Sequence, residues 1–191
     1  MTASADSADR IPLVYSWATD DDVAAVVPLV QSAYRGNASR GGWTTEADLL
    51  DGQRINDDML RDLLAQPGGH VLLARDADDA LLVCCELREP DGPGAPAYFG
   101  MFAVSPTLQG GGQGRVVLAE AERIARDEFG ADAMEMTVIG RRAELIAWYE
   151  RRGYARTGET RPFPYDDERY GRPKVADLDF VVLRKSLTDP A

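Results

Sequence analysis

Residues 104–115 read VSPTLQGGGQGR and place three consecutive glycines and a fourth between an apolar run and a helix-like run. Glycine loses more conformational entropy on folding than other residues, so such a cluster needs a reason. A P-loop would need lysine and then serine or threonine after the last glycine, and a dinucleotide-binding loop would need G-x-G-x-x-G; neither pattern is present. The remaining possibilities are a turn that offers free amides to a phosphate at a helix N-terminus, and a turn that only lets the helix pack closely.

The segments on either side of this loop predict an α+β fold with α/β-like features. Three apolar runs before it, 70–75, 80–87 and 97–104, are separated by turn-forming residues and predict an antiparallel meander. Helical periodicity predicts helices at 113–129 and 142–152 after it, and at 23–34, 45–50 and 56–65 before the meander. Further strands are predicted at 13–18, 134–139, 154–160 and 178–187. One mixed sheet with helices on both faces is the expected architecture.

The composition limits the classes of function. The 191 residues carry a net charge of −11, which argues against nucleic acid or an anionic membrane as a general partner. Cys84 and Cys85 are adjacent in a strand and point to opposite faces, so we expect two unpaired thiols in a reducing, cytoplasmic compartment. Residues 1–10 contain no apolar stretch and are expected to form a disordered tail before a single domain at 11–191.

A second motif follows the loop. Residues 144–154, ELIAWYERRGY, have helical spacing and end in a glycine that suits a helix terminus. The pattern Gln109-x-x-Gly112-x-Gly114 resembles the acyl-CoA pyrophosphate motif of the GNAT acyltransferase superfamily, and Tyr149-Glu150-x-x-Gly153-Tyr154 resembles the segment that this family carries on its next helix. The order and separation of the two motifs also match, and the resemblance covers about residues 13–187.

The resemblance implies a GNAT-type fold: a single mixed, mostly antiparallel, twisted sheet of about seven strands, in which strand 97–104 splays from strand 134–139. It also implies that acetyl-CoA is the co-substrate, with no metal, and that its pantetheine and pyrophosphate bind in the splay and on the glycine loop. Arg142 stands where many relatives carry an asparagine that touches CoA, so it is expected to bind a phosphate or the pantetheine, or to be solvated. The implied CoA-binding residues are Met101, Phe102, Ala103, Val104, Gln109, Gly110, Gly111, Gly112, Gln113, Gly114, Arg115 and Arg142.

The catalytic groups follow from the same resemblance. An amine would attack the thioester directly, and Tyr149 would act as general acid towards the departing CoA thiolate; the alternative for Tyr149 is a core aromatic. The splayed strand has no carboxylate to serve as base. Glu86 or Glu135, each in a neighbouring apolar run, could take that role, and so could a chain of water molecules.

Two long connections, 35–56 and 161–174, are expected to bind the acceptor. They mix aromatic residues with both signs of charge, and the residues chosen from them are Trp43, Arg54 and Tyr165. This mixture suits a small primary amine that also carries a carboxylate. The sequence therefore predicts a cytoplasmic N-acetyltransferase, monomeric or homodimeric, that acts on a small molecule. A non-catalytic acyl-CoA-binding sensor and a nucleotide-binding or structural domain are the alternatives.

Overall fold

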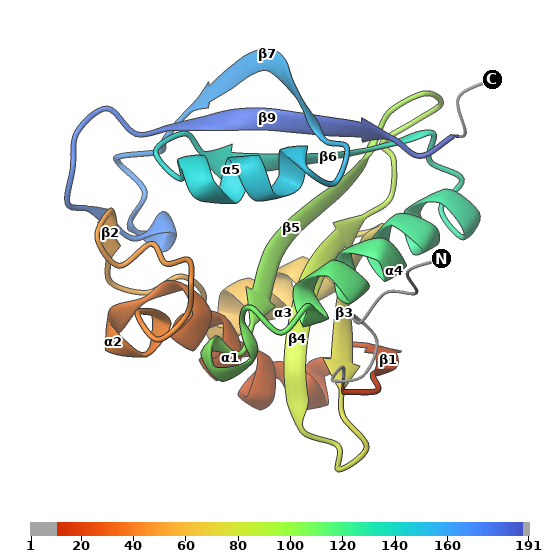
Figure 1. Cartoon of the computed structure of the whole chain (residues 1–191), viewed down its shortest axis with the longest axis horizontal. Helices are drawn as coiled ribbons and strands as arrows, with labels where there is room; N and C mark the ends of the chain where they lie inside the picture. The colour runs from red at the N-terminus through yellow and green to blue at the C-terminus, as the bar shows by residue number, and fades with distance from the viewer. Residues whose placement is uncertain (1–10, 189–191) are drawn as a thin grey trace, which may run out of the picture.

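A seven-stranded sheet runs through the computed structural model, which describes residues 11–188 (Figure 1). The tail predicted for residues 1–10 lies outside the described residues. Within the described part, neighbouring strands are antiparallel except for β5 and β6, which are parallel. In spatial order the strands are β1 (Val14–Trp17), β3 (Gly69–Arg75), β4 (Leu81–Arg88), β5 (Ala97–Val104), β6 (Ala133–Ile139), β9 (Asp179–Ser186) and β7 (Ala155–Pro162).

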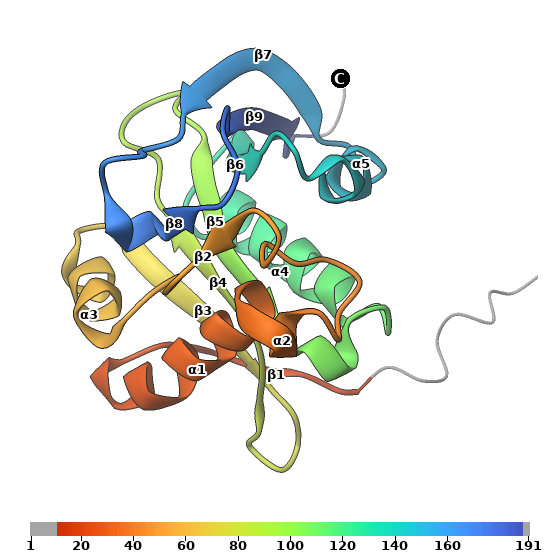
Figure 2. The same ribbon diagram turned by 90° about the vertical axis from the view of Figure 1, so that its left-hand side faces the viewer.

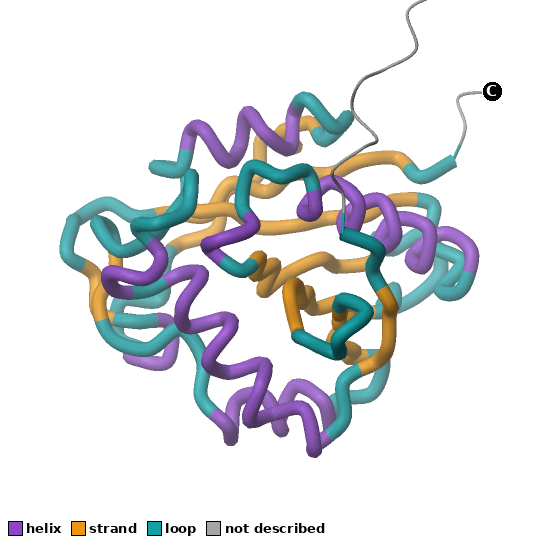
Figure 3. Tube along the Cα trace, turned by 60° about the horizontal axis from the view of Figure 1, so that its bottom comes forward, coloured by secondary structure: helices purple, strands orange, loops and turns teal. Residues whose placement is uncertain are grey.

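Helices cover both faces of the sheet, as Figure 3 shows. One face packs against α1 (Val23–Tyr34) and α3 (Asp57–Ala65), and the other against α4 (Gln113–Asp127) and α5 (Ala143–Glu150). Cys84 belongs to the first of these cores and Cys85 to the second, and both thiols are unpaired, so the predicted alternation is confirmed. The single-turn helix α2 (Gly36–Ser39) and the 3₁₀ turns η1 (Asp20–Asp22), η2 (Pro106–Leu108) and η3 (Glu168–Tyr170) complete the helical elements. No helix in the described part of the chain is long and apolar enough to cross a membrane.

The parallel pair β5 and β6 separates soon after it begins. Its strands pair at two positions, Ala97 with Met134 and Tyr98 with Glu135. Beyond these positions β6 continues beside β9 and β5 continues beside β4, so the two halves of the sheet open like a V, as predicted (Figure 1). The register between β4 and β5 shifts between Cys84 and Glu86, and Met101 has a φ of +42° at this bulge. A bulge bends its strand locally and redirects its side chains, which here happens beside the opening.

The two long connections lie against each other through a two-stranded ladder. β2 (Leu50–Asp51) pairs with β8 (Arg172–Pro173), although the two are far apart in the sequence (Figure 2). The helix predicted at 45–50 is therefore wrong. One turn does form, with the Leu50 amide donating to the Glu46 carbonyl at 2.9 Å, but Leu50 then enters the ladder. Burial of Leu50 in a small core with Phe163 overrides the local helical periodicity.

The other predicted elements agree with the structure to within a few residues, which is the usual uncertainty of element ends. The α5 helix matters most for the site, because Ile146 and Tyr149 are its two buried residues. Ile146 has no exposed surface and packs among the strands of the sheet. Ile146 is therefore a main contact that holds the helix, and with it Tyr149, against the core.

Replacement of Ile146 by alanine is expected to lower the free energy of unfolding by about 2–5 kcal/mol, because a buried aliphatic side chain is lost and a cavity remains. Glu150→Ala, on the exposed face of the same helix, removes a surface pair with Arg156 and is expected to cost less than about 1 kcal/mol. Urea unfolding of both variants measures the difference. Equal losses would show that α5 is not held to the sheet through Ile146.

Candidate active site

Two cavities meet where β5 leaves β6. The larger, of about 680 Å³, lies between the diverging strands and the connections 35–54 and 161–170. The smaller, of about 170 Å³, lies between the glycine loop, residues 43–44 and α5. They share five lining residues: Tyr34, Phe102, Arg142, Leu145 and Tyr149. A ligand in one cavity can therefore meet a ligand in the other at these side chains.

The glycine loop forms one wall of the smaller cavity and offers backbone donors. Gly110 and Gly112 have φ values of +89° and +82°, which glycine adopts without strain. Gly112 caps α4, and the first-turn amides of Gln113 and Gly114 have no acceptor among the described residues, whereas the Arg115 amide donates to the Gly112 carbonyl at 3.1 Å. The first turn of α4 contains no acidic residue. This arrangement suits an anion, because free amides and the positive end of the helix dipole point the same way.

The exposed edge of β5 is not bare. The Tyr34 hydroxyl donates to the Phe102 carbonyl at 2.9 Å, and Gln109 Nε2 donates to the Val104 carbonyl at 3.2 Å. These two side chains satisfy carbonyls that the missing neighbour strand leaves unpaired, because buried polar groups must find partners in some way. Gln109 Oε1 is buried and has no partner among the described residues, so it is an acceptor available to a ligand amide.

Two other residues expected to bind CoA direct their side chains elsewhere. The Ala103 side chain is buried in the core that α1 covers, so only its backbone faces the strand edge. The Gln113 side chain donates to the Ile11 carbonyl at 3.3 Å, so it too offers the site only its amide.

Tyr149 lies at the junction of the two cavities. Its side chain is 4% exposed and is packed edge-on against Trp148 and Tyr154. No group among the described residues hydrogen bonds to its hydroxyl, although the ring lines both cavities. Burial raises the pKa of Tyr149 above its usual value of 10.0, so the phenol stays protonated at neutral pH. It is therefore a proton donor without a protein acceptor.

The two candidate bases differ sharply in their surroundings. Glu135 is buried and lies between Arg161 at 2.8 Å and Arg184 at 2.5 Å, so both of its oxygens are neutralised. Burial raises the pKa of Glu86 above the usual 4.5, and Arg88 and Arg54 oppose this shift only in part. A side chain at the cavity-lining residue Gly100 would place its Cβ 2.9 Å from Glu86 Oε2, so the carboxylate lies directly over this strand position. Glu86 itself lines neither cavity, whereas Glu135 lines the larger one, so Glu86 approaches that cavity only beside Gly100.

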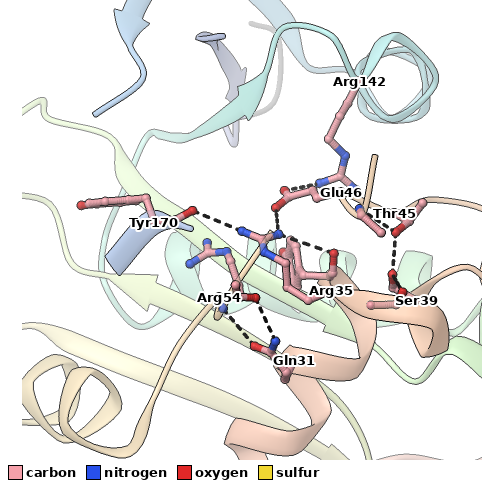
Figure 4. Close-up of polar contacts among 12 residues, drawn as sticks. Gln31, Arg35, Ser39, Thr45, Glu46, Arg54, Arg142 and Tyr170 are labelled. Carbon is pink, nitrogen blue, oxygen red and sulfur yellow. Dashed lines mark hydrogen bonds and ion pairs between the residues drawn. The ribbon is translucent and has the colours of Figure 1, made fainter. Parts of the chain in front are cut away.

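A buried network of charges forms the wall between the cavities (Figure 4). Glu46 accepts from Arg35 and, at 2.7 Å, from Arg142, which also donates to Thr44 at 2.8 Å. Burial alone would raise the pKa of Glu46, but Arg142, Arg35 and Arg54 together hold it below its usual value, so the carboxylate stays charged. Arg142 is thus turned towards Glu46 and is not solvated. It also lines both cavities, so its contact with CoA stays a prediction.

Sequence reasoning did not select Tyr34, Arg35 or Glu46 as site residues. Tyr34 nevertheless lies inside the charged network: the guanidinium carbons of Arg54 and Arg142 are 5.1 and 5.8 Å from the centroid of its ring. The available signal was an aromatic residue and an arginine at the end of a helix, followed by a glycine-rich connection with a lone glutamate. That signal becomes informative only when the fold brings the connection back over the helix end.

The three expected acceptor residues are not brought together. Arg54 lines the larger cavity. Trp43 lines the smaller one, with its ring centroid 6.4 Å from that of Trp148. The preceding Gly42 lies so close to the Gln109 side chain that a Cβ there would be 2.1 Å from Gln109 Oε1. Tyr165 lines neither cavity; it is 45% exposed and its hydroxyl accepts from the Leu178 amide at 2.6 Å, so it braces a loop.

Comparisons with known proteins agree with this geometry. The model of the acetyltransferase (GNAT) family matches residues 33–154, which is more than half of the chain. A search of curated protein sequences found no match to this chain. The crystal structure of a putative phosphinothricin N-acetyltransferase has a TM-score of 0.67 at 19% identity and covers 93% of this chain and 100% of that one. A chimera of the spermidine N-acetyltransferase SpeG from Vibrio cholerae and hSSAT has a TM-score of 0.63 at 16% identity and covers 92% and 95%. The chain belongs to the GNAT acetyltransferase family and is an acyltransferase.

Proposed function

We propose that this protein transfers the acetyl group of acetyl-CoA to the primary amine of a small molecule, with both substrates bound at once. The observation that carries the proposal is the junction of the two cavities at Tyr149, where a donor on the glycine-loop side would meet an acceptor on the other. The family uses acetyl-CoA as co-substrate, and two of the similar structures are named for amine substrates, phosphinothricin and spermidine.

The residues of the smaller cavity fit the co-substrate. The amides of Gly112, Gln113 and Gly114, with the start of α4, would hold its pyrophosphate, and Arg115 lines the same cavity. The edge of β5 at Phe102 and Val104 would take the pantetheine as an added strand. Tyr34 and Gln109 now cover the two carbonyls on that edge, so they would yield them or add their own polar groups.

The chain's own groups then manage the protons. Acetyl-CoA supplies an activated acyl group as a thioester. Tyr149 holds a proton at its hydroxyl and can deliver it to the leaving sulfur as general acid. Glu86 can accept the proton of the attacking ammonium, directly or through water, since its raised pKa brings it nearer to the working pH. A backbone amide near Phe102 would polarise the carbonyl of the thioester.

The first test is calorimetric titration of the protein with acetyl-CoA. We expect micromolar binding that is lost in Gly112→Glu, because the new carboxylate stands among the amides and repels the pyrophosphate. Gly94→Glu is the matched control, since that glycine also has a positive φ, +76°, and no heavy atom lies within 4 Å of an added Cβ. Binding that both variants retain would rule out the glycine loop as the pyrophosphate site.

The role of Tyr149 is tested by Tyr149→Phe. Loss of a general acid is expected to lower kcat by about 10²–10⁴-fold while leaving the affinity for acetyl-CoA unchanged. Tyr154→Phe is the control, because that neighbouring hydroxyl donates to Glu122 at 3.0 Å and lines neither cavity. An unchanged kcat in Tyr149→Phe would mean that Tyr149 is only a core aromatic residue. Binding of acetyl-CoA without turnover in the wild type would favour an acyl-CoA sensor.

The choice of base is tested by the pH dependence of kcat/KM. Glu86 must be deprotonated to act, so activity should fall as the pH drops through its pKa, which lies above the usual 4.5. Glu86→Gln is expected to remove this acid limb and to lower kcat/KM by about 10²-fold or more. Glu135→Gln should keep the limb, because Arg161 and Arg184 already neutralise that carboxylate. If kcat/KM depends on pH in the same way in both variants, neither glutamate is the base, and water accepts the proton of the amine.

A further inference from the structure

The larger cavity contains more positive charge than its carboxylates neutralise. Arg35, Arg54 and Arg142 all line it, and Glu46 is the acidic group of their network. The whole lining holds six arginines, the other three being Arg88, Arg161 and Arg184, against four carboxylates: Glu46, Glu89, Asp91 and Glu135. Arg161 and Arg184 pair with Glu135, and Arg88 pairs with Glu86, which lies outside the lining. The wall is thus positive in a protein whose net charge is −11. Such a contrast directs anions to this cavity and away from the rest of the surface.

Arg54 is the arginine of this network that has no direct ion pair among the described residues, although Glu46 and Glu86 act on its charge from a distance. Arg35 and Arg142 both pair with Glu46, but no hydrogen bond or ion pair reaches the Arg54 guanidinium from any described residue, and no dashed line reaches it in Figure 4. A partly buried guanidinium whose N–H donors have no acceptor is costly to fold around, so an arginine kept only for stability is expected to have one.

Helix α1 also holds the backbone of Arg54 in place. Its backbone amide donates to Gln31 Oε1 at 2.9 Å, and the same Gln31 donates to the Gly52 carbonyl at 3.2 Å, so helix α1 anchors the turn. The side chain lies over the Tyr34 ring, whose hydroxyl reaches the β5 edge at Phe102. The guanidinium is therefore preorganised beside the junction of the two cavities, with its donors unused.

We infer that the acceptor amine carries an acid group, a carboxylate or a phosphonate or phosphinate, and that Arg54 binds its oxygens. This inference rests on the proposed function for the identity of the reacting amine. A guanidinium offers two parallel N–H donors that match such an oxyanion. Glu46 holds Arg35 and Arg142 in place while leaving the network positive, so a polycationic amine is repelled and a neutral one gains nothing from Arg54.

The test compares amines that differ only in the acid. Common α-amino acids, their carboxamides, aminoalkylphosphonates and spermidine are titrated calorimetrically into the protein in the presence of CoA, and then assayed as acceptors. At least one acid-bearing amine is expected to bind tenfold or more tightly than its carboxamide. The carboxylate and phosphonate arms of the panel separate the two kinds of acid.

Arg54→Met is expected to weaken that binding, and to raise the KM for the acid-bearing acceptor, by on the order of 10²-fold. The KM for acetyl-CoA and the affinity for the carboxamide should not change. Arg54→Lys should recover part of the loss, because lysine restores the positive charge but not the two parallel N–H donors of the guanidinium. Arg40→Met, in the same connection but paired with Asp48 at the surface, is the matched control.

Each result has one meaning. Equal binding of acid and carboxamide, an Arg54→Met variant that behaves like the wild type, or no acid-bearing amine bound at all would overturn the inference. If neutral amines are still acetylated in those cases, the proposed function stands without it. If an acid-bearing amine binds through Arg54 and none is acetylated, acid recognition stands and the proposed transfer falls.

Discussion

The structure depends on one interruption of the sheet: β5 and β6 pair at two positions and then separate. A strand that leaves its neighbour exposes backbone groups that must find other partners. Here Tyr34 and Gln109 supply them, one from the end of α1 and the other from the glycine loop. The side chains that stabilise the open edge are thus the ones that line the cavities, and the separation itself leaves Tyr149 at the meeting point.

Both cavities between the separated strands present positive charge, but from different groups. On one side, helix-terminal amides and glycine conformations suit a phosphate without any lysine. On the other, an arginine cluster is organised by one buried glutamate, and Arg142 and Tyr34 belong to both sides. In a protein whose net charge is −11, the lining of the larger cavity thus holds more arginines than carboxylates, which is the basis of the acid-bearing acceptor that we infer.

The fold was largely predictable because its signals are local. The glycines after β5 predict a turn, the helical period predicts α4, and the apolar run around Cys84 predicts β4. The two motifs together identified the family. The site was less predictable because its roles arise from contacts between distant segments. Leu50 leaves its helical turn for a partner 123 residues away, and Glu135 is neutralised by Arg161 and Arg184, which are 26 and 49 residues away. Neither fact is written in the surrounding sequence.

The close fit of Gly42 against Gln109 has a thermodynamic meaning. One connection, residues 35–54, touches the glycine loop through Gly42 and carries Glu46 and Arg54 into the other cavity. An acyl donor that displaced Gln109 from Val104 would also change the space beside Gly42, and would so act on the connection that carries Glu46 and Arg54. Two ligands that bias one segment are energetically coupled, and linkage makes the coupling reciprocal: whatever factor the donor adds to acceptor affinity, the acceptor returns to the donor.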